Sequence, residues 1–252
     1  MKRVSRSMAG IAPAILVSIL IGGCGKYSAT PEEKPKAFGT VVISVSGEKQ
    51  TAGVGSALDQ PLVVQVNDAQ GAAVAGALVR FTAARGVMFH PDRGLTGSDG
   101  QLTTMVTLGG MSGHYQITAS TQTATTQTAA GKAAAVQIDE IALGYQEMLG
   151  AKINEIHCVR CHDPESTAER VSNHDNLEPA PHAFTEGAVL NAISDANLFA
   201  MISHGGAALN KSAAMPPYGN TLTKVEVDAL VAYIRAVADP PYRAQGVLYA
   251  GN

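Results

Sequence analysis

The sequence predicts a chain of two folded domains, an all-β sandwich followed by an all-α domain, and three observations lead to this fold class. Between residues 39 and 138, short apolar alternations are separated by turn residues, which is typical of antiparallel strands. Between residues 139 and 238, apolar residues recur at helical spacing. A Cys-x-x-Cys-His motif lies at residues 158–162, within the helical region.

The first 23 residues are typical of a signal peptide. They carry three basic and no acidic residues, and a short apolar run, Ile11–Ile21, is interrupted by Pro13. Because this run is too short to span a bilayer comfortably, a cleaved signal is favoured over a permanent membrane helix. Small residues then precede Cys24, and this ending resembles a bacterial lipobox. An ordinary signal peptide or an uncleaved anchor is the alternative.

The lipobox resemblance implies that Cys24 is lipidated and anchors the mature protein to a membrane. Residues 24–38 are polar and contain prolines, so we expect a solvated tether. Gly25 follows the cysteine, and in enteric lipoproteins a residue other than Asp here implies the outer rather than the inner membrane. The expected location is therefore the bacterial cell envelope, as a periplasm-facing or surface lipoprotein.

Residues 39–138 predict one β-sandwich, with Asn-, Asp- and Gly-containing turns at residues 67–71 and 98–100. Strands are expected at Thr40–Ser46, Leu62–Val66, Ala77–Ala83, Gln101–Leu108 and His114–Ser120. These turn and alternation residues resemble a bacterial Ig-like domain of the invasin/intimin type. Nothing in the region suggests chemistry, so its expected role is that of a spacer or a docking module.

The motif Cys158-Val159-Arg160-Cys161-His162 predicts covalent attachment of one haem c. Two thiols three positions apart can each form a thioether with a haem vinyl group, and His162 then supplies the proximal imidazole. A zinc site would need a second Cys/His pair, and no cysteine follows Cys161. A redox dithiol would need a βαβ context that the flanking sequence does not offer. With Cys24 lipidated, no cysteine remains for a disulfide.

Helical patterns surround the motif. One helix is expected over Ile141–Ile156, and two short helices over Gly187–His204. Thr223-Lys224-Val225-Glu226 has the form of a capping box and starts an amphipathic helix that ends before Asp239-Pro240-Pro241. Residues 239–252 form a C-terminal tail.

With the Met-Pro-Pro sequence at residues 215–217, residues 139–238 resemble a class I c-type cytochrome. The resemblance implies that Met215 is the distal iron ligand, opposite His162. His204, at the end of a helix near this loop, is the main rival for that position. Weaker rivals are Met201, His157, His174 and His182. The segment Pro164–Phe184 does not align with the family, which leaves open which backbone carbonyl orients His162, with Pro164, Pro179 and Pro181 near in sequence.

Residues 139–252 contain seven basic and fourteen acidic residues, a net charge of −7. An acidic surface disfavours nucleic acid and favours redox partners, a donor and an acceptor, with basic docking faces. The predicted function is single-electron transfer at an envelope membrane. A haem oxidoreductase or peroxidase-like enzyme with an open sixth site is one alternative, which only the polar loop containing His174 and His182 favours. A redox subunit of a larger respiratory complex, with the sandwich as docking module, is another.

Overall fold

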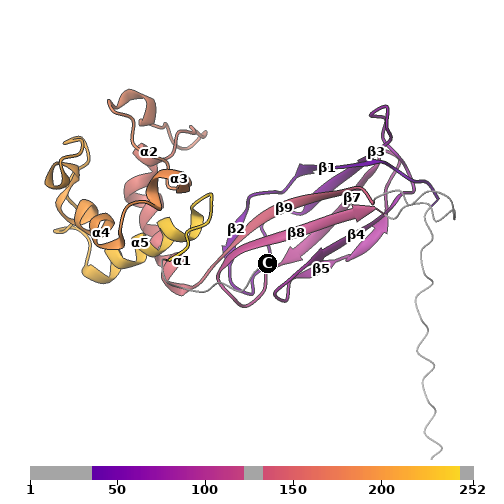
Figure 1. The fold of residues 1–252 in the computed structure, drawn as a ribbon, viewed down its shortest axis with the longest axis horizontal. Coiled ribbons are helices and arrows are strands. Elements are labelled where there is room, and N and C mark those ends of the chain that lie inside the picture. Colours follow the sequence, from indigo (N-terminus) through magenta and orange to yellow (C-terminus); the bar gives the residue numbers. More distant parts are fainter. Residues whose placement is uncertain (1–35, 122–132, 245–252) are drawn as a thin grey trace, which may run out of the picture. The chain divides into compact units, whose positions relative to one another are not determined.

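The computed structural model describes residues 36–121 and 133–244 (Figure 1). Strands occupy the described chain as far as Leu143, and helices follow, so the predicted all-β domain followed by an all-α domain is confirmed. The predicted signal peptide, Cys24, most of the tether and the end of the tail lie outside the described residues. Within the two described ranges, no helix combines the length and the apolar character needed to cross a bilayer.

The strands form two sheets. In chain order they are β1 (Val41–Ser46), β2 (Thr51–Gly53), β3 (Leu62–Asn67), β4 (Leu78–Ala83), β5 (Met88–His90), β6 (Arg93–Leu95), β7 (Gln101–Thr107), β8 (Gly113–Thr121) and β9 (Ala135–Leu143). One sheet has the strand order β1-β3-β7-β5, and the other has the order β2-β9-β8-β4-β6. Paired strands are antiparallel, except that β2 runs parallel to β9. This pairing makes the domain a sandwich of two sheets.

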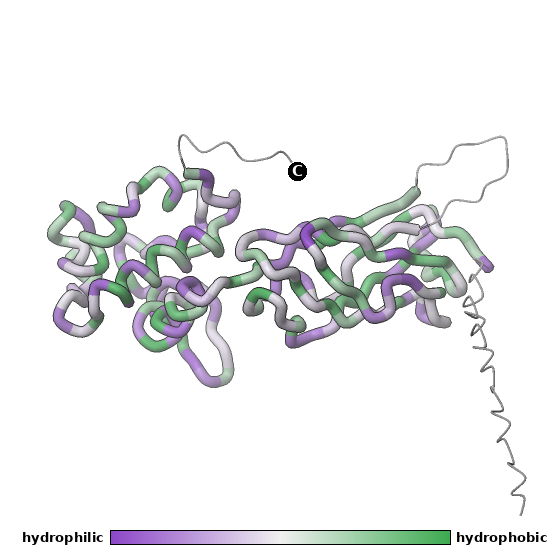
Figure 2. The backbone as a smooth tube through the Cα atoms, turned by 90° about the horizontal axis from the view of Figure 1, so that it is seen from below, coloured by the Kyte–Doolittle hydropathy of each residue, from purple (hydrophilic) through white to green (hydrophobic). Residues whose placement is uncertain are grey.

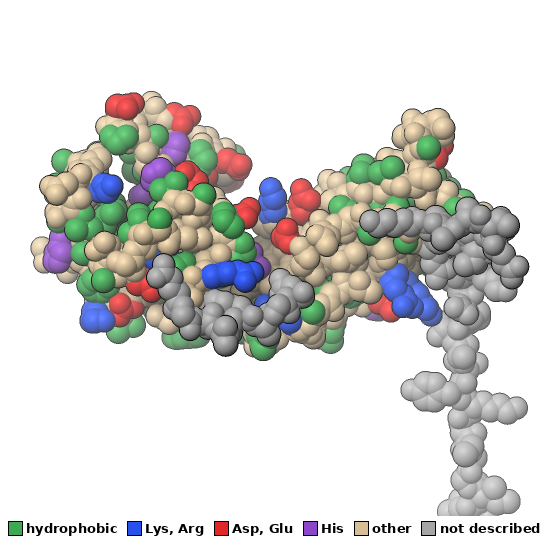
Figure 3. All heavy atoms as spheres, viewed as in Figure 1, with side chains coloured by type: hydrophobic (Ala, Val, Ile, Leu, Met, Phe, Trp, Pro, Cys, Tyr) green, Lys and Arg blue, Asp and Glu red, His purple; other side chains and the backbone are tan. Residues whose placement is uncertain are grey.

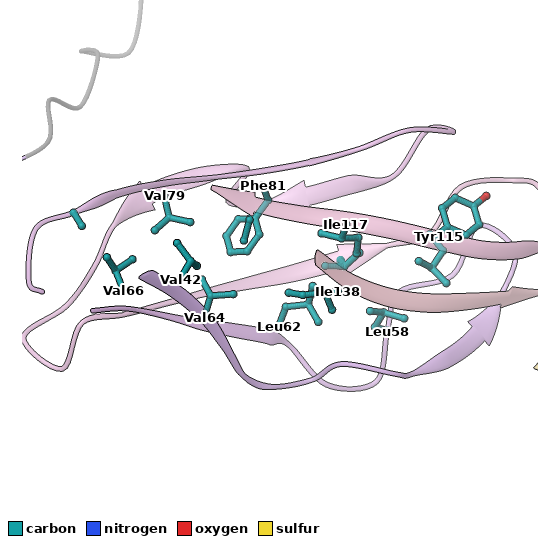
Figure 4. Packing of buried hydrophobic residues seen from close by; sticks show 14 of the residues in the cluster. Val42, Leu58, Leu62, Val64, Val66, Val79, Phe81, Tyr115, Ile117 and Ile138 are labelled. Atoms are coloured by element: carbon teal, nitrogen blue, oxygen red, sulfur yellow. The ribbon is translucent and has the colours of Figure 1, made fainter. Parts of the chain in front are cut away.

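One hydrophobic core lies between the inner faces of the two sheets (Figure 4). Val64 and Val66 of β3 are fully buried and alternate with half-buried neighbours. Ile117 of β8 and Ile138 of β9 contribute from the other sheet. Figure 2 shows the resulting interleaving of hydrophobic and hydrophilic stretches along the chain. The period-two pattern of the sequence is therefore the pattern of burial.

All five predicted strands are confirmed, each end within one residue, as β1, β3, β4, β7 and β8. Sequence reasoning missed β2, β5 and β6 because three residues are too few to show an alternation. It also missed β9, and the helix expected over Ile141–Ile156 is wrong at its start, because Ile141–Leu143 belong to β9. Pairing with β8 along eight residues, and with β2 on the other side, overrides the local helical pattern. The expected boundary after Ile138 therefore falls inside a strand.

The helical domain contains α1 (Tyr145–Ile153), η1 (Asn154–Cys158), α2 (Val159–His162), η2 (His174–Asn176), α3 (Gly187–Leu190), α4 (Asp195–His204), η3 (Gly206–Leu209) and α5 (Lys224–Val237). The predicted capping box is present at α5: the Glu226 backbone N–H donates to the Thr223 hydroxyl (3.3 Å), and the Thr223 backbone N–H donates to the Glu226 carboxylate (2.7 Å). Helices α1 and α5 pack closely at Gly150, where a Cβ atom would lie 2.1 Å from the Ala229 carbonyl oxygen. Glycine is required at this crossing.

A carboxyl group is buried in the sandwich at Glu140 of β9. Its Oε2 accepts a hydrogen bond from the Gln50 backbone N–H (2.6 Å), and its Oε1 has no partner among the described residues. Burial, with smaller contributions from the nearby charges of Glu48 and Asp139, raises the pKa of Glu140 from 4.5 to about 8, although the Gln50 hydrogen bond opposes the shift. The carboxyl group is therefore protonated at neutral pH.

Replacing Glu140 with Gln should remove a pH dependence of stability. Because the folded-state pKa lies above the ordinary value of 4.5, the unfolding free energy should fall as pH rises from 4.5 to about 8, by at most about 1.4 kcal/mol per pH unit. Denaturant unfolding of wild type and Glu140→Gln across this range would measure the slope, with the exposed carboxylate variant Asp59→Asn as control. An identical slope in wild type and Glu140→Gln would contradict the assignment.

Candidate haem-binding site

A cavity of about 830 Å³ in the helical domain brings the predicted haem residues together: Cys158, Cys161, His162 and Met215 all line it. Much of the remaining lining is apolar and includes Phe184, Leu190, Leu198, Ile202, Leu230 and Ile234. Mostly apolar cavities of roughly 300–1,000 Å³ are typical of small-molecule and cofactor sites. The cavity and its lining therefore provide a site of the right kind for a large apolar cofactor.

The two cysteines lie on one short helical stretch. Cys158 ends the π-helical turn η1, and Cys161 lies one turn further along, in α2. Residues three apart on a helix share a face, so the motif's spacing brings both thiols to the cavity. Burial, and to a lesser extent the neighbouring Cys161, raises the pKa of the Cys158 thiol to about 12. Redox-active dithiols have lowered pKa values, so this environment does not favour the dithiol alternative.

The imidazole of His162 is fixed by a backbone carbonyl. Its Nδ1 donates to the His182 carbonyl oxygen (2.7 Å), and its ring packs against Phe184 with the ring centroids 4.7 Å apart. Because a carbonyl can only accept, Nδ1 holds the proton and Nε2 keeps its lone pair for a metal. Burial lowers the pKa of His162, opposed by this hydrogen bond. A neutral imidazole with a free Nε2 is the form that ligates iron.

The segment that carries this carbonyl is held by Glu186. Glu186 Oε1 accepts from the Ala183 backbone N–H (2.8 Å), and Oε2 lies 2.9 Å from Nδ1 of His182. These two hydrogen bonds lower the pKa of the Glu186 carboxyl group, the Ala183 N–H contributing most. The same segment is joined to the end of α5, since Asp239 N–H donates to the Thr185 carbonyl (2.8 Å). Sequence reasoning named His182 only as a rival ligand and missed its carbonyl, because a backbone acceptor has no side-chain signature. It also missed Glu186.

The Met215 loop is held against the end of α4. The Gly206 N–H donates to the Met215 carbonyl (3.1 Å), and the Tyr218 N–H donates to the Ile202 carbonyl (2.9 Å). Gly205 has φ +82°, and a Cβ there would lie 2.9 Å from the Met215 carbonyl oxygen. The Tyr218 hydroxyl donates to the His157 carbonyl (3.1 Å), which ties this loop to the residue before Cys158.

Of the five rival ligands, two lie outside the cavity lining and three belong to it. His204 is exposed at the end of α4 and does not line the cavity. His174 also lies outside the lining, and its Nδ1 contacts Asp175 (2.7 Å). Met201, His157 and His182 do line the cavity, although the His182 side chain contacts Glu186. In the described part of the chain, no group of three or more His, Cys, Asp or Glu side chains is placed to hold a metal ion.

The donor set fits a covalently held haem. Two thiols, a neutral imidazole with a free Nε2 and a thioether line one largely apolar cavity. These are the groups that bind haem c through two thioethers and His/Met ligation. Cys158, Cys161 and His162 follow one another on η1 and α2, whereas Met215 is brought to them by the fold.

Removing the Tyr218 hydroxyl should loosen the connection between the Met215 loop and the haem-attachment segment. Tyr218→Phe should lower the unfolding free energy by about 1 kcal/mol, because the His157 carbonyl loses its donor. Tyr145→Phe is the matched control, since Tyr145 is 91% exposed, and its effect should stay within about 0.5 kcal/mol. Denaturant unfolding would measure both variants, and equal effects would show that the hydrogen bond does not stabilise the loop.

Solved structures similar to this chain match it only in part. Among solved structures, similar ones include the D00–D0 domain of intimin, with 19% identity and a TM-score of 0.30, covering 41% of this chain and 46% of that one. The adhesin InvE of Yersinia pseudotuberculosis has 16% identity and a TM-score of 0.32, covering 40% and 32%. The chain thus spans less than half the length of these structures. No curated protein matches the chain.

The helical domain matches a family model. Residues 146–234 match the model described as cytochrome c oxidase, cbb3-type, subunit III. The matched region begins in α1 and ends in α5, so it contains the Cys-x-x-Cys-His motif, Met215 and the lining of the cavity. Domains of this kind carry covalently attached haem c. Residues 146–234 of this chain are therefore a c-type cytochrome domain.

Proposed function

We propose that the protein is an exported monohaem c-type cytochrome that transfers single electrons between redox proteins at a bacterial envelope membrane. The observation that carries this proposal is the joint placement of Cys158, Cys161, His162 and Met215 on one cavity of the cytochrome domain. When bound there, haem supplies a one-electron couple between ferric and ferrous iron. With His162 and Met215 both holding the iron, no position on it would be left for a substrate, so the site would serve electron transfer.

Each residue has a separate task in this proposal. Cys158 and Cys161 hold the cofactor through thioethers, so it stays bound in both oxidation states. His162 provides Nε2, with its tautomer set by the His182 carbonyl. Met215 provides a soft thioether, which favours ferrous iron and raises the reduction potential. The largely apolar lining would limit contact between water and the bound cofactor.

The proposed partners are a redox donor and a redox acceptor with basic docking faces. Residues 139–252 carry a net charge of −7, and acidic side chains are scattered over the visible surface of the helical domain (Figure 3). Charge of one sign steers partners of the opposite sign, so the rate of electron transfer should fall with salt. We also propose that Cys24 carries a lipid anchor, which holds the protein at a membrane, the outer membrane being favoured.

A second candidate function is that of a redox subunit in a larger respiratory complex. The family matched by residues 146–234 is described as an oxidase subunit, which favours this candidate. The sandwich would then serve as a docking module instead of a spacer. The enzyme alternative has less support, because His174 does not line the cavity and the His182 side chain contacts Glu186.

Replacing Met215 with Ala should open the sixth coordination position of the haem-loaded protein. We expect reduced Met215→Ala to bind carbon monoxide, whereas wild type does not, because the alanine offers no ligand. His204→Ala and Met201→Ala are the matched controls, one for the exposed rival and one for the other methionine in the lining. Optical spectra with and without carbon monoxide would measure all four proteins. Carbon monoxide binding by His204→Ala but not by Met215→Ala would assign the sixth position to His204.

A further inference from the structure

A single peptide group connects His162 to a carboxylate. The carbonyl oxygen that accepts from His162 Nδ1 belongs to His182, and the N–H of that same peptide group belongs to Ala183. This N–H donates to Glu186 Oε1 at 2.8 Å. The peptide group between residues 182 and 183 is therefore hydrogen-bonded at both ends, to the imidazole on one side and to a carboxylate on the other.

Resting on the function proposed above, we infer that Glu186 is a positioning residue that tunes the reduction potential through this peptide group. A carboxylate that accepts from the N–H polarises the amide and makes its carbonyl oxygen a stronger acceptor. A stronger acceptor at Nδ1 makes the imidazole more basic at Nε2. A more basic ligand stabilises ferric over ferrous iron. Glu186 therefore lowers the potential, against the effect of Met215.

The surroundings of Glu186 support this role. The second oxygen, Oε2, lies 2.9 Å from Nδ1 of His182, so the carboxylate spans two successive residues and is held in one orientation. The Glu186 N–H donates back to the Ala183 carbonyl at 2.9 Å, which closes a tight loop. Gly187 N–H donates to the Asp239 carbonyl at 3.0 Å and anchors the next residue to the end of α5. The carboxylate is therefore supported by backbone contacts on both sides.

The test compares the midpoint potentials of haem-loaded variants. Glu186→Gln keeps the size of the side chain and an oxygen acceptor but removes the charge, so the potential should rise. We expect up to about a tenfold change in the equilibrium constant for reduction, which is about 59 mV for one electron. Glu178→Gln is the matched control, because it removes the same charge from an exposed position of the same loop without a contact to the 182–183 peptide group. The midpoint potential of Glu178→Gln should shift clearly less than that of Glu186→Gln.

A second variant distinguishes the effect of the hydrogen bond on the reduction potential from the effect of the charge. Glu186→Asp keeps the charge but shortens the side chain, which should break the hydrogen bond from the Ala183 N–H. Faster hydrogen exchange of the Ala183 N–H, measured by NMR, would show that this hydrogen bond is broken. With the bond broken, its potential should also rise, which a charge acting only through space would not produce. If Glu186→Gln does not attach haem, the inference is still tested by Glu186→Asp.

The outcomes separate this inference from the proposed function. If wild type binds haem with both axial positions filled, but Glu186→Gln shifts the potential no more than Glu178→Gln, the inference is overturned and the proposed function stands. An unchanged potential in Glu186→Asp with the bond shown to be broken overturns it as well. A wild type without covalent haem would overturn the proposed function itself.

Discussion

The haem site depends on the hydrogen bond from Nδ1 of His162 to the carbonyl oxygen of His182. The histidine of a Cys-x-x-Cys-His motif could hold either tautomer, and only one of the two tautomers leaves Nε2 free. The carbonyl selects that tautomer because it can only accept. Burial in the cavity and packing against Phe184 then favour the neutral ring and fix its orientation. The motif supplies the histidine, and the segment around His182, twenty residues further along the chain, holds it in the tautomer that can bind iron.

The other half of the site is a loop whose own backbone is tied down. Met215 reaches the cavity because Gly205 and Gly206 allow the chain to turn sharply after α4, and their backbone lies against the Met215 carbonyl. Tyr218 joins this loop to the segment carrying the cysteines. Each of these hydrogen bonds contributes about 1 kcal/mol net. Acting together, they order the loop and so reduce the entropy that ligation by its thioether would otherwise cost.

Strong local patterns made much of this protein predictable. The spacing of Cys158, Cys161 and His162 identified the cofactor, and the Thr223–Glu226 capping box identified the start of α5. The alternation of apolar residues predicted the longer strands of the sandwich, apart from β9. For Met215, the sequence offered only a resemblance and several rivals, and the fold places it on the same cavity as the motif.

The features that the sequence did not predict depend on distant partners. Ile141–Leu143 have a helix-compatible pattern, but pairing with β8 and β2 makes them a strand. The carbonyl of His182 could not be predicted as the partner of His162, because every residue has a backbone carbonyl. The prolines that lie near in sequence, Pro164, Pro179 and Pro181, do not supply it. Glu140 would ordinarily be expected at a surface, and only the sheet arrangement shows that it is buried. Lipidation of Cys24, which lies outside the described residues, stays a prediction.

The optical spectrum of the oxidised, haem-matured wild-type protein tests the central claim most directly. A low-spin spectrum with the methionine-to-iron charge-transfer band is the predicted result, because His162 and Met215 would then fill both axial positions. A high-spin spectrum would contradict the account, since it would mean that one axial position is open. A low-spin spectrum without that band would also contradict it, by showing that a residue other than Met215 completes the site.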